Sequence, residues 1–185
     1  MDEEADEAPP RRLNARATDI FDLGNLTFYP GPSPYLERRA LVFDLALTGS
    51  PAPLPIATYV EAASATYPHL TAALFPDHAH LFAALTSEVG RLDMDLELQR
   101  WRVQPRGRFF RIATQAFDRR TQHQVVYFVW DWLESIASGE PFDHAARMAT
   151  LQGSFEQSPY GGPTTYAILR AAARRDIPIR YLRAE

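Results

Sequence analysis

The sequence predicts an α+β fold, in which a small mixed sheet of about three strands packs against a layer of about five helices. Three observations support this class: runs with strand character occur at three places, helical periodicity fills the intervals between them, and no internal repeat is visible. The chain of 185 residues is long enough for one domain with a substantial core. We expect residues 1–24, which begin with the acidic stretch MDEEADEAPPRR, to be a disordered tail, and residues 25–185 to be the domain.

The first predicted strand is RALVFDLAL, from Arg39 to Leu47, in which Asp44 interrupts the apolar row. The stretch before it, NLTFYPGPSPY, is rich in turn residues and aromatic residues. The stretch after it, TGSPAPLP, contains too many prolines to be helical.

Two helices are expected next. Thr58 to Tyr67 has good helix formers and stops before Pro68. A longer helix is predicted from Pro76 to Trp101, because apolar residues recur there at spacings of three and four, namely Leu81, Leu85, Val89, Leu92 and Leu96. Gly90 in its middle costs about 1 kcal/mol relative to alanine, which is consistent with a break or a close helix contact.

The segment QPRGR predicts a turn, and RFFRIATQAF, from Arg108 to Phe117, predicts the second strand. The segment HQVVYFVWDWLESIASG begins with β-formers, but its apolar spacing favours a helix that ends at Gly139. After the turn at residues 118–121, Thr121 can cap this helix.

The last part of the domain is predicted to contain two helices and the third strand. Asp143 caps a helix that runs through about Phe155. A second helix spans Pro163 to Arg175, with proline in the first turn, where no amide hydrogen is needed. Ile177 to Leu182 has strand character and closes the chain.

Composition excludes several kinds of chemistry. The absence of cysteine excludes disulfides, thiolate metal sites and cysteine nucleophiles. All 19 basic residues are arginine, so a lysine Schiff base and a phosphate-loop lysine are excluded too, which argues against ATP chemistry within this chain. No apolar run approaches the roughly 20 residues of a membrane span. We expect a cytoplasmic protein that has no membrane partner.

Charge is distributed unevenly along the chain. Residues 1–100 contain seven arginines and fifteen acidic residues, a net charge of −8, whereas residues 101–185 contain twelve arginines and eight acidic residues, a net charge of +4. This asymmetry suits a ligand that carries both signs of charge, although solvated faces explain it equally well. The overall net charge of −4 and the lack of a dense basic helix argue against nucleic acid as a partner.

The acidic candidates lie in LDMDLELQRW. Asp93 and Glu97 are four residues apart on one expected helical face, and Asp95 lies elsewhere on the circumference. Such a pair can share a metal or a proton, but it can equally be a solvated face with a surface ion pair to Arg100. A histidine metal site in DHAH has weak support, because His78 and His80 would point in roughly opposite directions on a helix.

The basic candidates suit a carboxylate-bearing ligand, which guanidinium groups grip in a bidentate manner. Among several arginine groups, we select Arg108 and Arg111. The turn at residues 161–165 offers a second anion site, because glycines let backbone amides approach a ligand and the helix dipole favours negative charge there. A turn that merely packs the last helix onto the last strand needs the same residues, namely Gly161, Gly162, Pro163, Thr164 and Thr165.

Several segments together resemble the N-terminal domain of cyanophycin synthetases, with closer similarity to the second type, which polymerises β-aspartyl-arginine dipeptides. No single motif carries the resemblance; the order and spacing of the segments do. They cover about residues 28–183, and they are PGPSPYLERRALVFDLAL, TYVEAASATYPHL, LDMDLELQRW, the strand and helix up to VVYFVWDWLE, and YGGPTTYAILRAAARRDIPIRYL.

The resemblance implies a domain that holds the polymer. In that family, ATP-grasp and Mur-ligase-like domains follow and perform the ATP-dependent ligation. The sequence up to Glu185 contains neither domain. ATP and Mg²⁺ would therefore belong to those domains, in the same or a separate chain. Some members of the first type resemble metal-dependent hydrolases, with H-x-x-E-H before L-E-L-Q. Placing that pattern on residues 96–99 puts Val89, Leu92 and Asp93 at the ligand positions, and two of these three cannot bind metal.

The leading hypothesis is therefore a non-catalytic domain that binds a cyanophycin-like peptide, or β-aspartyl-arginine, or an ATP-grasp partner. Ligand guanidinium groups would meet Asp93, Asp95 and Glu97, and ligand carboxylates would meet Arg108, Arg111 and the turn at residues 161–165. Two alternatives stay open. One is a residual metal-dependent peptide hydrolase that uses His78, His80, Asp93 and Glu97. The other is a structural or homo-oligomerising lobe whose aromatic strip meets another subunit, namely Tyr127, Phe128, Trp130 and Trp132.

Overall fold

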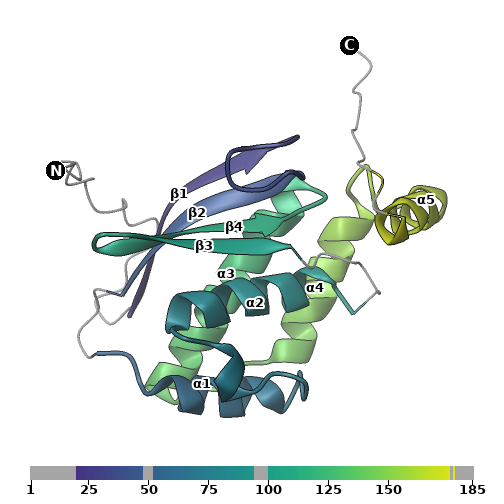
Figure 1. Ribbon diagram of the computed structural model, residues 1–185. Coiled ribbons are helices and arrows are strands. Elements are labelled where there is room, and N and C mark those ends of the chain that lie inside the picture. The colour runs from purple at the N-terminus through teal and green to yellow at the C-terminus, as the bar shows by residue number, and fades with distance from the viewer. Residues whose placement is uncertain (1–19, 48–51, 94–99, 176, 178–185) are drawn as a thin grey trace, which may run out of the picture.

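Four strands form one antiparallel sheet, and helices cover one of its faces (Figure 1). The structure is a computed structural model that describes residues 20–47, 52–93, 100–175 and 177. The strands lie in the order β1-β2-β4-β3. Their bounds are β1 (Phe21–Tyr29), β2 (Ala40–Leu47), β3 (Trp101–Arg106) and β4 (Phe109–Gln115).

The helices form a layer beneath the sheet. Helix α2 contacts β3 and β4, and helix α3 contacts β1 and β2 as well as α1, α2 and α4. Helix α5 lies at the periphery of the molecule, beyond the end of α4 (Figure 1). The helices are α1 (Ile56–Ser64), the 3-10 turn η1 (Ala72–Leu74), α2 (His78–Gly90), α3 (Arg119–Ser138), α4 (His144–Glu156) and α5 (Pro163–Arg174). No helix among the described residues is both long and apolar enough to cross a bilayer.

The predicted α+β class is confirmed, with two differences in the sheet. The described strands number four rather than about three, and every pairing among them is antiparallel rather than mixed. The third predicted strand, Ile177 to Leu182, lies outside the described residues except for Ile177, which is not in a strand.

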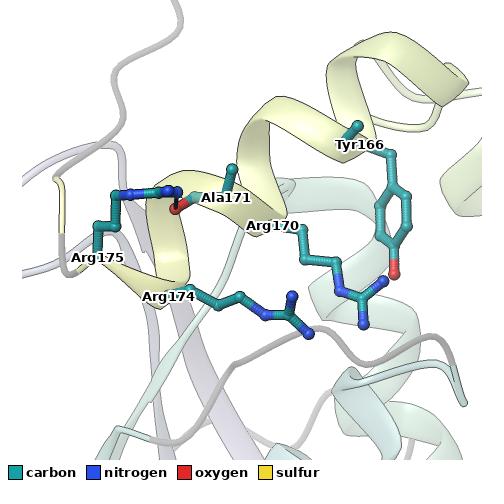
Figure 2. Close-up of a pocket in the computed structure, with 6 residues that line it drawn as sticks. Tyr166, Arg170, Ala171, Arg174 and Arg175 are labelled. Atoms are coloured by element: carbon teal, nitrogen blue, oxygen red, sulfur yellow. Dashed lines mark hydrogen bonds between the residues drawn. The ribbon is translucent and has the colours of Figure 1, made fainter.

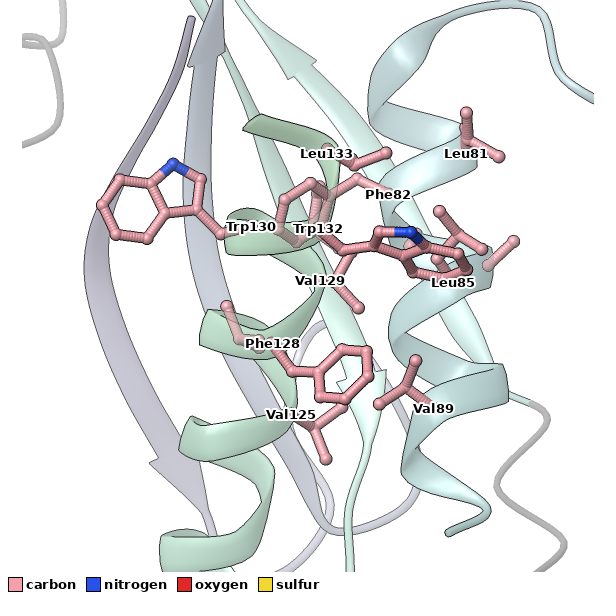
Figure 3. Packing of buried hydrophobic residues seen from close by; sticks show 14 of the residues in the cluster. Leu81, Phe82, Leu85, Val89, Val125, Phe128, Val129, Trp130, Trp132 and Leu133 are labelled. Carbon is pink, nitrogen blue, oxygen red and sulfur yellow. The ribbon is translucent and has the colours of Figure 1, made fainter. Parts of the chain in front are cut away.

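The core lies between the sheet and the pair α2 and α3. Alternate residues of β2 face the helices, and Phe43 is fully buried against Phe82 of α2, with ring centroids 5.7 Å apart. Figure 3 shows Leu85 and Val89 of α2 beside the apolar face of α3. Burial of this apolar surface is the main source of stability for such a layered fold.

Helix ends follow capping chemistry. The Asp143 carboxylate accepts a hydrogen bond from Ala146 N at 2.9 Å, which confirms the predicted cap of α4. Gly139 has a φ of 73° and ends α3, as predicted. The cap at the start of α3 is Asp118, which accepts from Thr121 N at 2.7 Å, so Thr121 is the donor rather than the cap.

The predicted limit of the N-terminal tail is wrong, because β1 begins at Phe21, before residue 25. Phe21 and Leu23 are buried. The backbone amides of Ile20 and Phe21 donate to Glu134 Oε1 of α3 at 2.8 and 2.7 Å. A buried carboxylate on a distant helix therefore holds the start of this strand, and local sequence does not reveal it.

The predicted helix from Pro76 to Trp101 is also wrong at its C-terminal end, of which residues 94–99 lie outside the described residues. Helix α2 ends at Gly90, and Leu92 and Asp93 have positive φ values of 55° and 52°. Trp101 begins β3, and its ring lies against His80, with centroids 5.9 Å apart. The segment expected as a turn, QPRGR, contributes the end of β3, and the hairpin turns at Gly107, which has a φ of 56°.

Candidate functional site

The residues expected to bind the ligand do not gather at one place. Arg108 is exposed in the β3–β4 hairpin, at the end of the sheet opposite α5 (Figure 1). Asp93 is exposed just beyond the end of α2. Asp95 and Glu97 lie outside the described residues. Arg108 and Asp93 therefore lie in separate regions of the molecule.

Arg111 is engaged by a buried carboxylate of the neighbouring strand. Its Nε donates to Asp44 Oδ1 at 2.8 Å, and its Nη2 donates to Asp44 Oδ2 at 3.1 Å. The Asp44 side chain is 1% exposed. The hydrogen bonds to Asp44 raise the pKa of Arg111 above its ordinary value. In this arrangement Arg111 neutralises the buried charge of Asp44. This structural role explains the presence of Arg111 without a bound ligand.

Neighbouring groups complete the Arg111–Asp44 pair. Asn25 Nδ2 donates to Asp44 Oδ2 at 2.8 Å, and Arg111 Nη1 donates to Tyr35 Oη at 3.3 Å. The guanidinium carbon also lies 5.7 Å from the centre of the Phe109 ring. Strand register explains the pair, because Asp44 of β2 lies directly opposite Arg111 of β4.

The turn before α5 has a steric requirement for glycine at one position. A Cβ placed on Gly161 would lie 2.1 Å from Phe155 O and 2.4 Å from Glu156 Cα, so the chain can approach the end of α4 only without a side chain. A Cβ on Gly162 would meet only Thr165 Oγ1, at 3.9 Å. The turn was interpreted either as an anion site or as a turn that packs the chain. The packing interpretation explains the glycine at position 161. Thr164 is exposed and Thr165 half-buried at the first turn of α5.

The same turn is anchored to the sheet. Arg39, which is 9% exposed and precedes β2, donates from Nη1 to Phe117 O at 2.8 Å and to Tyr160 Oη at 2.7 Å. The Tyr166 ring packs edge-on against Phe155, and Leu169 is buried. These contacts place α5 against the end of α4.

Arginines line a hollow of about 740 Å³ along α5, which we call the α5 hollow. Figure 2 shows the side chains of Tyr166, Arg170 and Arg174 projecting to the same side of α5. Arg175 instead turns back and donates to Ala171 O at 3.1 Å. The residues around the α5 hollow are Tyr166, Ala167, Arg170, Ala171, Arg174 and Arg175.

The α5 hollow has the chemistry of an anion site. Guanidinium groups bind carboxylates or phosphates through paired N–H donors, and a tyrosine hydroxyl can donate a further hydrogen bond. Two guanidinium groups one helical turn apart suit a ligand with more than one carboxylate.

Sequence reasoning did not select Tyr166, Arg170 or Arg174. A signal was present, because residues 166, 170 and 174 are four apart and therefore share one helical face.

The two histidines of the hydrolase alternative have local structural partners. His78 Nε2 lies 2.9 Å from Leu54 O, and His80 Nδ1 lies 2.7 Å from Asp77 Oδ1, the carboxylate that caps α2. Within the described part of the chain, no three histidine or acidic side chains are grouped so as to hold a metal ion. The described residues therefore supply no ligand set for that alternative.

The aromatic strip proposed as an oligomer contact is mostly internal, so that interpretation of the strip is wrong. Phe128, Trp130 and Trp132 are 3%, 4% and 6% exposed. Trp130 Nε1 donates to Phe21 O at 2.6 Å, and Figure 3 shows Trp130 and Trp132 pointing to opposite sides of α3. Tyr127 is half-buried. Helical periodicity turns the consecutive aromatic residues toward different neighbours, so they form no common outer surface.

Comparison with known proteins adds no relative. No family model matches the chain, and no curated protein matches it.

Proposed function

We propose that this chain is a non-catalytic binding domain for an aspartate–arginine peptide of the cyanophycin type. The observation that carries the proposal is the α5 hollow, where Arg170 and Arg174 line a concave surface beside Tyr166. The resemblance of the sequence to the N-terminal domain of cyanophycin synthetases supplies the ligand class, and the guanidinium chemistry of the hollow supplies the mode of binding.

In this proposal, α5 recognises the carboxylates of the ligand. A volume of about 740 Å³ falls within the range of roughly 300–1,000 Å³ that small-molecule pockets occupy, so one or two dipeptide units fit. Asp93, exposed beyond α2, is the described acidic residue that we assign to a guanidinium group of the ligand. Binding orients the peptide and breaks no bond.

Synthesis would take place elsewhere. We assign ATP and Mg²⁺ to ATP-grasp and Mur-ligase-like domains in the same or a separate chain, and we assign the assembly to the cytoplasm. The present domain would then raise the local concentration of the peptide near those sites.

Isothermal titration calorimetry with β-aspartyl-arginine oligomers tests the proposal. We expect binding that weakens as salt is added, because charged contacts are screened. Replacing both Arg170→Gln and Arg174→Gln should weaken binding by about tenfold or more, since charge-assisted hydrogen bonds contribute roughly 1.5–3 kcal/mol each. The control is Arg120→Gln, which removes an exposed arginine from α3 and should leave the affinity unchanged.

Two further ligands show which charges are recognised. Poly-aspartate should compete for the α5 hollow, and free arginine should not. Absence of heat at millimolar oligomer, or equal weakening by the α5 variant and the Arg120→Gln control, would contradict the proposal.

A further inference from the structure

A second basic surface runs along strand β3 to its hairpin with β4, and the hairpin lies at the other end of the sheet from α5. Its members are Arg102, Arg106 and Arg108, which we call the hairpin arginines, and all three are exposed. Register places Arg102 and Arg106 opposite Ala113 and Phe109 of β4, on the sheet face that the helices leave uncovered. Within the described part of the chain, none of the three forms an ion pair. They form an uncompensated positive row in a chain of net charge −4.

The row lies on an edge strand. Strand β3 is the last strand in the order β1-β2-β4-β3, so one of its sides pairs with β4 and its other side pairs with no described strand. Arg102, Gln104 and Arg106 alternate along β3, which places successive side chains of this face about 7 Å apart. Arg102 and Arg106 lie on either side of Gln104 and are therefore about 14 Å apart along the strand. An extended segment with carboxylates four residues apart would match that spacing.

The start of the described chain lies at the same end of the sheet. Phe21 of β1 pairs with Leu47, and Leu45 pairs with Phe110, which in turn pairs with Pro105 of β3. Three strand spacings, about 14 Å in all, separate β1 from β3. The twelve residues from 8 to 19 can extend to about 40 Å, so residues before them can reach the hairpin.

An acidic segment with regularly spaced carboxylates precedes the start of the described chain. Residues 2–7, DEEADE, contain five carboxylates, and those of Asp2, Glu4 and Asp6 follow the two-residue period of an extended strand. We propose that residues 2–7 dock on the hairpin arginines of the same chain. Charge complementarity and reach both favour this occupant, and tethering provides an effective concentration in the millimolar range that a weak charged contact needs.

The inference does not depend on the α5 hollow, which lies on different elements at the opposite end.

Paramagnetic NMR of the full chain tests the inference. The chain contains no cysteine, so Ala5→Cys carries a single nitroxide label without competing sites. We expect selective broadening of the amide signals of β3 and the hairpin, with little effect on α5. Broadening of α5 instead, or uniform weak broadening, would overturn the inference.

Matched variants show whether charge causes the contact. The variants Arg106→Gln with Arg108→Gln, and separately the replacement of all five carboxylates of residues 2–7 by amides, should each remove the broadening, as should high salt. The control is Arg119→Gln with Arg120→Gln, an exposed pair at the start of α3, which should leave it unchanged. Broadening that persists in the neutralised variants would show that charge does not hold the segment there, and would also overturn the inference.

Discussion

Two regions of this molecule place arginine side chains in different surroundings. Arg111 lies on the sheet, 19% exposed, with both oxygens of the Asp44 carboxylate within hydrogen-bonding distance. Arg170 and Arg174 lie on a peripheral helix and line the α5 hollow. Arg111 lies directly opposite the carboxylate of Asp44 in the neighbouring strand, whereas Arg170 and Arg174 line a concave surface on a helix, so their positions in the fold give these arginines different roles.

The largest expected effect tests the structural side of this comparison. Arg111→Met keeps much of the side-chain volume but leaves the Asp44 carboxylate buried, with the hydrogen bond from Asn25 Nδ2 still in place. Removing one partner of a buried pair costs about 3–5 kcal/mol, so we expect the free energy of unfolding to fall by about 3 kcal/mol. Urea denaturation, followed by tryptophan fluorescence, measures this change.

Arg174→Met is the matched substitution on α5. Because Arg174 is exposed, the free energy of unfolding should change by less than about 0.5 kcal/mol. Equal destabilisation by the two variants would remove the distinction between the two regions.

The next effect concerns the turn at Gly161, which packs against the end of α4 and precedes α5. Gly161→Ala places a Cβ against Phe155 O, so the turn has to shift, at a cost of about 1–3 kcal/mol. We expect faster hydrogen exchange across α5 and weaker binding at the α5 hollow, with the amides of the sheet unaffected. Gly162→Ala, which meets open space, is the control and should change neither measurement.

The smallest expected effect is a pH dependence of the free energy of unfolding, which arises from His144 at the start of α4. Burial lowers the pKa of His144 below its ordinary 6.5, and Asp93 opposes that shift. The unfolded chain then binds more protons than the folded chain below about pH 6.5, so stability should fall as the pH drops from 7.5 through that value. His144→Gln should reduce the slope of the free energy of unfolding against pH; an unchanged slope would contradict the assignment.

Elements with local signals were predicted well. The strand at residues 39–47 and the helices after Asp118, Asp143 and Gly162 follow from apolar spacing, capping residues and glycine stops, and all of them are present in the structure. In the candidate site, the spacing of four residues is enough to predict that Tyr166, Arg170 and Arg174 lie on one face of α5.

Elements stabilised by distant partners were missed. Strand β1 depends on Glu134, more than a hundred residues away, and β3 depends on pairing with β4. Trp101 continues an apolar helical pattern in the sequence, but in the structure its ring packs on His80 and its backbone joins the sheet. No local pattern contains these contacts.

By itself, the sequence determined the α+β class, the helix limits that depend on caps and glycines, and the exclusion of lysine and cysteine chemistry, because each follows from residue type and short-range spacing. Tertiary structure alone decided which charges cancel one another. Asp44 and Arg111 are 67 residues apart and meet through strand register. Arg170 and Arg174 line the α5 hollow together with Tyr166, because the Tyr166 ring packs against Phe155 and so places this face of α5 beside the end of α4.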